Sequence, residues 1–229
     1  MNKSSTFTAL RVIITLFTVF SYSHSAAQFS DDADVYTDKV KVISVGALLG
    51  SNFCQVDGDN YAGYHKTGLN VGGIGYVRLN KDFAFSFELL YSQRGAKDNG
   101  VRYSPVDSAT LITKYRINTP YAEIPLMINY FDKHKSHFGT GISYSRLLNA
   151  SEQMESNTGY MVDFSRYPFR NSTLDYVVSA QMHLWKGLFF NVRFQYGITP
   201  MRSDAPEGMA RAERQYNNLW SVRLMYMVR

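Results

Sequence analysis

The feature that most constrains the fold of this chain is a strict alternation of apolar and polar residues, cleanest in the stretch LFFNVRFQYGI at positions 188–198. Apolar side chains stand at every second position, and Asn191, Arg193 and Gln195 stand between them. Successive side chains of a β-strand point to opposite faces of the sheet, so the pattern predicts a strand with one apolar and one polar face. The rest of the chain must decide whether the apolar face meets a protein core or a lipid bilayer.

The same alternation recurs along the chain and predicts eight strands. Their ranges are 41–51, 68–79, 83–94, 122–130, 138–144, 175–184, 188–198 and 220–228. The connections alternate in length: the tight turns are 80–82, 132–136 and 186–187, and the long loops are 52–66, 95–114, 149–173 and 200–215. An even number of strands, with short turns at one end and long loops at the other, is typical of bacterial outer-membrane barrels.

The placement of lysine favours lipid on the apolar side. After residue 27 no lysine lies within the body of a predicted strand, and the three on the long-loop side, Lys66, Lys97 and Lys114, fall in or beside loops. A lysine on the lipid-facing surface at the bilayer midplane would cost about 2–4 kcal/mol. The 17 Tyr and 15 Phe also suit strands whose ends carry interfacial aromatic rings.

The N-terminus has the pattern of a secretory signal peptide. Lys3 and Arg11 precede the apolar run VIITLFTVF or border it, and small residues lead to a predicted cleavage between Ala27 and Gln28. The expected organisation is a signal peptide at 1–27, a short segment at 28–39 and a barrel at 40–229. Removal of the signal leaves 22 basic against 19 acidic residues, and no run of basic residues suggests nucleic acid as a partner.

These observations predict an all-β protein of the cell outer membrane. The expected fold is an eight-stranded antiparallel up-and-down transmembrane β-barrel with short periplasmic turns and long extracellular loops. The alternative is a secreted, soluble calycin-like barrel that binds an apolar ligand, and it requires the Phe and Val faces to point inward.

Three segments of the chain resemble the PorT-type outer-membrane β-barrel family of Bacteroidetes, a porin family also described by an outer-membrane β-barrel domain. They are VGALLGSNF at 45–53, FELLYSQRGAK at 87–97 and YAEIPLMINY at 121–130. The resemblance covers nearly all of 40–229 and implies a barrel that the insertion machinery places in outer-membrane lipid. It also implies an accessory role in protein secretion or contact with surface proteins. The C-terminus Met227-Val228-Arg229 departs from the aromatic ending usual in barrel assembly signals.

Charged residues on the predicted inner face form the first candidate site. The lumen of an eight-stranded barrel is just wide enough for side chains, so charges inside it must be paired. The predicted members of this network are Glu88, Glu123, Arg78, Arg94, Arg193 and Arg223. A salt-bridged plug that holds the barrel together is the favoured interpretation, and a proton or ion path is the alternative.

The third long loop supplies the second candidate site. It mixes aromatic and basic residues, namely Tyr160, Phe164, Arg166, Tyr167, Phe169 and Arg170. Such a mixture either docks a glycan or protein, or packs the loop on itself.

We expect neither enzymatic activity nor a cofactor or metal. A lipid-modifying Ser/His/acid site would need a histidine beside a serine on an accessible face. Three of the four histidines after the signal fall in loops or short turns, and His183 alone lies in a predicted strand, facing inward near the periplasmic end. The expected role is structural, surface-interacting or accessory to secretion.

Overall fold

The computed structural model describes residues 42–59, 63–103, 110–132, 136–159, 163–204 and 214–228. The predicted signal peptide, its cleavage site at Ala27 and Gln28, and Tyr160 of the third loop lie outside these ranges. Within them, no helix is long and apolar enough to cross a membrane.

The described chain consists of ten β-strands and one turn of 3-10 helix. The strands are β1 (Ile43–Asp57), β2 (Lys66–Arg78), β3 (Phe83–Asp98), β4 (Arg102–Tyr103), β5 (Leu111–Phe131), β6 (His137–Leu147), β7 (Ser151–Ser156), β8 (Ser172–Trp185), β9 (Leu188–Gly197) and β10 (Tyr216–Val228). The helical turn η1 is Phe164–Arg166.

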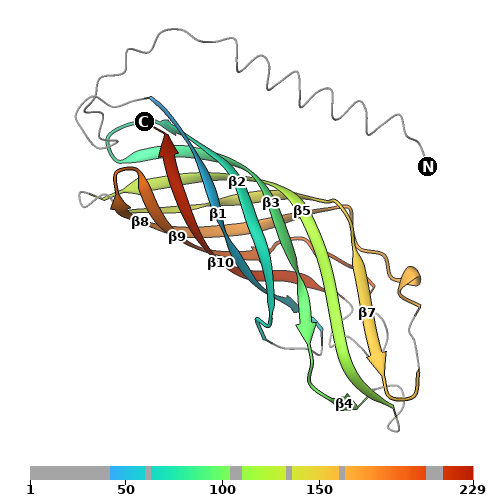
Figure 1. Cartoon of the computed structure of the whole chain (residues 1–229). Coiled ribbons are helices and arrows are strands. Elements are labelled where there is room, and N and C mark those ends of the chain that lie inside the picture. The colour runs from blue at the N-terminus through green and yellow to red at the C-terminus, as the bar shows by residue number, and fades with distance from the viewer. Residues whose placement is uncertain are drawn as a thin grey trace, which may run out of the picture. The chain divides into compact units, whose positions relative to one another are not determined.

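Eight of these strands close into a ring, as predicted (Figure 1). Every neighbouring pair is antiparallel, and the ring runs β1, β2, β3, β5, β6, β8, β9 and β10. The first and last strands of the ring pair along their length, from Val45 opposite Val228 to Asp57 opposite Tyr216. Because the ring closes, its wall has no strand edge with unpaired backbone groups. Such an edge would be costly in the hydrocarbon of a bilayer.

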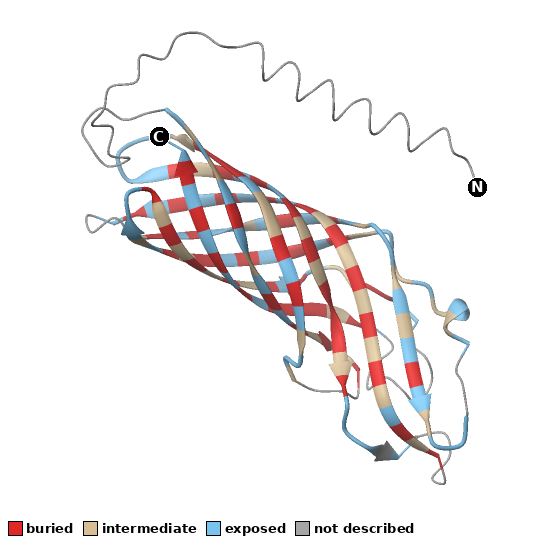
Figure 2. Cartoon of the chain, viewed as in Figure 1, coloured by how far each residue is buried: buried red, intermediate tan, exposed pale blue. Residues whose placement is uncertain are grey.

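The outer face of the ring is apolar and the inner face is polar. On β3, Phe87 and Leu89 have 42% and 62% of their surface exposed, whereas Glu88 between them is 1% exposed. The alternation of exposed and buried residues follows every strand of the ring in Figure 2. The predicted orientation is thus confirmed, and the soluble barrel with Phe and Val faces around an apolar ligand is wrong.

Two connections at the short-turn end show why the chain reverses tightly there. Lys186 and Gly187, which join β8 to β9, both have positive φ, at 37° and 93°. This is the backbone that a two-residue hairpin turn requires. Between β2 and β3 the Asn80 side chain accepts hydrogen bonds from the backbone N–H groups of Asp82 and Phe83, at 2.9 and 2.8 Å.

The long-loop end differs from the prediction, because part of what was expected to be loop is strand. β3 continues to Asp98, and β5 begins at Leu111 instead of near residue 122. β7 lies within the predicted loop 149–173 and pairs with β5. We call β4, β7, the outer ends of β1, β3 and β5, and the segments 163–170 and 201–204 that pack against them the loop-end extension. It forms because the cross-strand hydrogen bonds of β3 and β5 continue without a break from Glu123 to Tyr115.

The extension also corrects the expectation for lysine. Lys66, Lys97 and Lys114 lie inside β2, β3 and β5, although each lies toward the loop end of its strand.

Candidate functional site

The centre of the lumen is held by one guanidinium between two carboxylates. Arg94 of β3 donates from Nη2 to Glu123 of β5 at 2.6 Å and from Nη1 to Asp175 of β8 at 2.7 Å. Ser145 of β6 also accepts from Arg94 Nη2, at 3.1 Å. All four side chains are buried, so these contacts tie four strands together across the barrel.

A second group of charges fills the lumen on the short-turn side of the first. Glu88 of β3 accepts hydrogen bonds from Arg193 of β9 and, at 3.0 Å, from Arg223 of β10. Asn191 accepts from Arg223 Nε at 2.7 Å. Arg193 also contacts the sulfur of Met127 at 3.4 Å.

Together the two groups balance three arginines against three carboxylates, which is the condition under which buried charge is tolerated. Neutral polar side chains donate further hydrogen bonds to these carboxylates. Ser143 donates to Glu123 at 2.8 Å, and Gln195 donates to Asp175 at 2.9 Å. We call these ion-paired residues and their polar neighbours the lumen network.

Five of the six predicted network charges meet in the lumen network, and Arg78 lies elsewhere. It is on β2 at the short-turn end, where its guanidinium lies 4.4 Å from the ring centre of Phe131 and donates to the backbone oxygen of Lys81 at 3.1 Å. Sequence reasoning omitted Asp175 from the network. Its inward position in the alternation of β8 was the signal that could have placed it there.

An aromatic and methionine cluster fills the short-turn end of the lumen. His137 stacks on Phe131 with ring centres 4.3 Å apart, and its Nε2 lies 3.1 Å from the hydroxyl of Tyr76. The Phe189 ring forms T-shaped contacts with the rings of both His137 and His183. The cavity among these side chains is about 20 Å³, which is room for about one water molecule.

Two histidines, His137 and His183, lie at the short-turn end of the barrel. His137 was expected in a short turn, but it is the first residue of β6 and points into the lumen. It does so because Phe131, its direct partner on β5, is also an inward position. His183 is half-buried at the same end, against Phe189.

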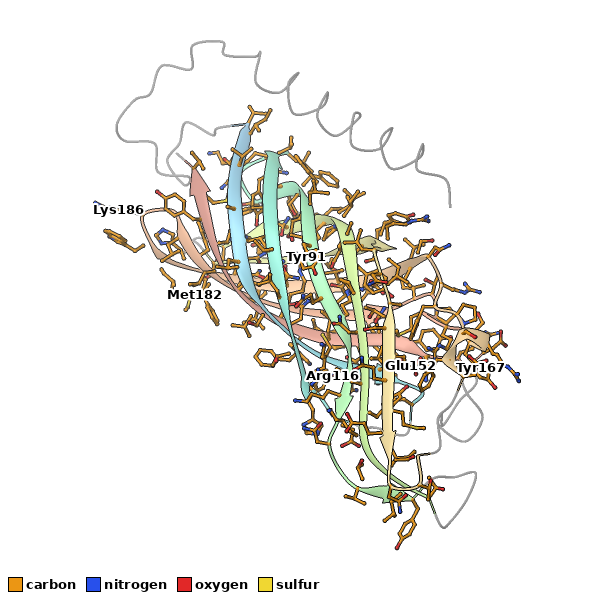
Figure 3. The ribbon with its side chains drawn as sticks, turned by 45° about the vertical axis from the view of Figure 1, so that its right-hand side comes forward. Tyr91, Arg116, Glu152, Tyr167, Met182 and Lys186 are labelled. Atoms are coloured by element: carbon orange, nitrogen blue, oxygen red, sulfur yellow. The ribbon has the colours of Figure 1, made fainter. Side chains whose placement is uncertain are left out.

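The loop-end extension has an apolar core of its own. Its buried residues are Val56, Ala96, Ile112, Tyr115, Ile117, Met154 and Met201. Glu152 of β7 accepts hydrogen bonds from Tyr115 and Arg202, and both charged side chains are buried. Figure 3 labels Glu152 on β7, beside the outer part of β5. Sequence reasoning missed this core because it treated the segments as loops.

The described residues of the third loop divide between this core and solvent. Phe164 and Phe169 pack against the core, and the Arg202 guanidinium lies 3.8 Å from the ring centre of Phe169. Arg166 and Arg170 are exposed: the first pairs with Asp163 at 3.3 Å, and the second donates to Ser203 at 3.1 Å. Tyr167 is half-buried, and Figure 3 shows it at the margin of the molecule.

One larger pocket opens at the loop end. Its volume is about 390 Å³, and its lining residues are His65, Lys97, Asp98, Asn99 and Gly100. Among the residues that the structure describes, no group of three or more His, Cys, Asp or Glu side chains is arranged to hold a metal ion.

Comparison with solved structures finds several outer-membrane proteins at low identity. The attachment invasion locus protein Ail of Yersinia pestis is 9% identical, with 81% of this chain and 98% of that chain covered and a TM-score of 0.44. Neisserial surface protein A is 10% identical, with coverages of 81% and 97% and a TM-score of 0.37. Outer membrane protein AlkL, solved in DMPC bilayers, is 10% identical, with coverages of 89% and 97% and a TM-score of 0.40.

The family comparison is more specific. No curated protein matches the sequence. The family model described as outer membrane protein beta-barrel domain matches residues 23–203, which is well over half of the chain. With the closed ring and its apolar outer face, this match places the protein in the outer membrane, and the chain belongs to the outer membrane protein β-barrel domain family.

Proposed function

We propose that this outer-membrane barrel is a non-enzymatic surface-interaction protein, whose closed cylinder anchors the loop-end extension outside the bilayer. The observation that carries the proposal is the combination of a filled lumen with an extension that has its own core.

The filled lumen argues against transport through the barrel. Arg94, Glu123 and Asp175 are each 0% exposed, and the cavity at the short-turn end, about 20 Å³, has room for about one water molecule and not for a continuous water column. A solute would have to separate buried ion pairs, and removing one partner of such a pair costs about 3–5 kcal/mol.

The length of β5 supports a role outside the membrane. It has 21 residues, about twice the 9–11 that a tilted strand needs to cross a bilayer. The excess packs in the extension core, and its Tyr115 donates a hydrogen bond to Glu152, which is paired with Arg202. A preorganised surface loses less conformational entropy when it binds than a disordered loop does.

Conductance of the purified protein in planar bilayers tests the closed lumen. We expect no steady ion current for the natural chain. A stable open-channel current would contradict the proposal and would favour an ion path through the lumen network.

Photo-cross-linking in intact cells tests the surface role. A photo-reactive residue replaces Tyr103 of β4, which is 74% exposed, and Leu79 at the short-turn end, 63% exposed, serves as the control. We expect a discrete cross-linked product from position 103 that is absent with Leu79. Absence of any product from position 103, or the same product from both, would contradict the proposal.

The finer assignments are part of the same proposal: the signal peptide rests on the N-terminal sequence pattern, and the secretion role rests on the resemblance to PorT-type barrels. The protein would carry a signal peptide removed before Gln28, reach the membrane through the barrel insertion machinery and act beside secretion-system or other surface proteins. Identification of the product cross-linked at position 103 would show whether the partner belongs to a secretion system.

A further inference from the structure

Three basic side chains, Lys66, Lys97 and Arg116, lie close together at the loop end of the barrel. Lys97 of β3 lies directly opposite Arg116 of β5, and both point outward, because their neighbours Ala96 and Ile117 are buried in the extension core. Lys66 of β2 starts from an inward position, opposite buried Cys54. Its Nζ nevertheless donates to the Asn118 side chain at 3.1 Å, and Asn118 stands at an outward position of β5, between two buried residues. Lys66 is also within electrostatic range of Arg116 and Lys97.

This basic cluster has no acidic partner among the described residues. None of the ion pairs there includes Lys66, Lys97 or Arg116. Arg116 Nε is buried and has no hydrogen-bond partner in the described part of the chain. Like charges directly opposite each other on neighbouring strands are destabilising, so an anion is needed to offset the pair formed by Lys97 and Arg116.

A neighbouring lysine, Lys114, does form an ion pair. Lys114 lies two residues before Arg116 on the same strand, and it pairs with Glu155 of β7 at 2.6 Å. Within the described ranges, therefore, one basic residue at this end is neutralised by a carboxylate, and the three of the cluster have no ion pair.

The cluster lies beyond the end of the apolar band on the barrel wall. The Gln93 side chain accepts a hydrogen bond from the Leu69 backbone at 3.0 Å, and Leu69 is 41% exposed on the apolar band. Lys97 is four residues beyond Gln93, about 13 Å along the strand or roughly 10 Å along the axis of a barrel with tilted strands. Figure 3 shows Tyr91 over the barrel body and Arg116 nearer to β4 and β7.

We propose that Lys66, Lys97 and Arg116 form a binding site on the barrel wall for the phosphate groups of an outer-leaflet glycolipid, whose acyl chains lie along the apolar face of β2 and β3. Arginine and lysine are the residues that bind phosphate best, arginine through two parallel N–H donors. A lipid is the partner of choice because the same strands present exposed apolar side chains, such as Leu69 and Leu89, roughly 10 Å or more below the cations. This inference does not depend on the proposed surface-interaction role.

Native mass spectrometry of the protein in neutral detergent micelles tests the site, with bisphosphorylated lipid A, its dephosphorylated form and inorganic phosphate as separate probes. We expect lipid A to bind at least tenfold more tightly than the dephosphorylated lipid, and inorganic phosphate to bind more weakly than either. Equal binding of the two lipids would overturn the proposal. Tighter binding of inorganic phosphate than of lipid A would also overturn it, because the site would then take free anions.

Variants locate the site. The triple variant K66Q/K97Q/R116Q should bind lipid A on the order of 100-fold more weakly, since each basic residue near an anionic surface contributes about fivefold. The matched control K114Q, which removes a lysine already paired with Glu155, should bind as the natural chain does. Unchanged binding by the triple variant would overturn the proposal. A mobility shift on boiling confirms that each variant folds. If a variant does not fold, the comparison of the two lipids with the natural chain still tests the proposal.

Discussion

At the scale of single residues, Arg94 is the side chain on which most of the lumen depends. It is the common partner of Glu123 and Asp175, and none of the three is exposed to water. Two carboxylates this close together in a water-excluded lumen repel each other unless a cation lies between them. The arginine therefore offsets a repulsion as well as forming two hydrogen bonds.

Replacement of this arginine by an apolar residue of similar length should destabilise the barrel strongly. We expect Arg94→Met to lower the free energy of unfolding by about 3–5 kcal/mol, because it leaves two buried carboxylates without a cation. Urea unfolding in lipid vesicles, followed by the loss of the heat-dependent mobility shift, measures this. The combined variant R94M/E123Q/D175N removes all three charges and should recover most of the loss. An R94M protein as stable as the natural chain would contradict the role of Arg94.

The residues of this group differed in how readily the sequence revealed them. Glu88, Glu123 and Arg94 stand in segments with clean alternation, so their inward position could be predicted. Which carboxylate meets which arginine could not, because the partners come from strands up to 135 residues apart, as Glu88 and Arg223 do. Such pairing depends on the stagger of the strands around the barrel, which alternation alone does not determine.

At the scale of elements, β5 begins at Leu111, eleven residues before the start that the alternation predicted at residue 122. Pro120 and Asn118 are residues that strands usually avoid, and they interrupt the apolar run before Tyr121. Ile117, Thr119 and Tyr121 nevertheless continue the inward alternation, each 0% exposed. Partners on β3 and β7 hold this segment as a strand, which is tertiary information that a local pattern lacks.

The extension should behave as a folded unit distinct from the barrel. Ile117→Ala removes a fully buried side chain from its core and should cost about 2–5 kcal/mol locally. We expect faster amide hydrogen exchange in β7 and the outer part of β5, with no change in the barrel strands β8 and β9. Gln153→Ala on the exposed face of β7 is the control and should change neither. Equal acceleration throughout the barrel would show that the extension has no separate core.

At the scale of the whole molecule, the orientation of the strands determines what the barrel surface contacts. The two tryptophans of the chain lie on the outer surface, Trp220 with 44% and Trp185 with 65% of its surface exposed. Trp220 packs beside Phe194, with ring centres 4.9 Å apart. This face of β9 and β10 is a band of aromatic and aliphatic side chains that water would solvate poorly.

Quenching by brominated lipids tests this face directly. In the variant Trp185→Phe, Trp220 is the one remaining fluorophore of its kind. We expect lipids brominated on the acyl chain to quench it strongly and aqueous acrylamide to quench it weakly. Strong quenching by acrylamide with no response to brominated lipids would mean that β10 faces water.

The arrangement of the two ends across the membrane gives the last prediction. The loop-end extension carries exposed Arg166, and the tight turn between β8 and β9 carries exposed Lys186. Long loops of outer-membrane barrels face the cell exterior and short turns face the periplasm. A cysteine introduced at position 166 should therefore react with a membrane-impermeant maleimide on intact cells, whereas one at position 186 should react only after the outer membrane is permeabilised. The native Cys54 is 1% exposed and should add little background. Labelling at position 186 alone on intact cells would reverse the assigned sides, and the basic cluster would then face the inner leaflet.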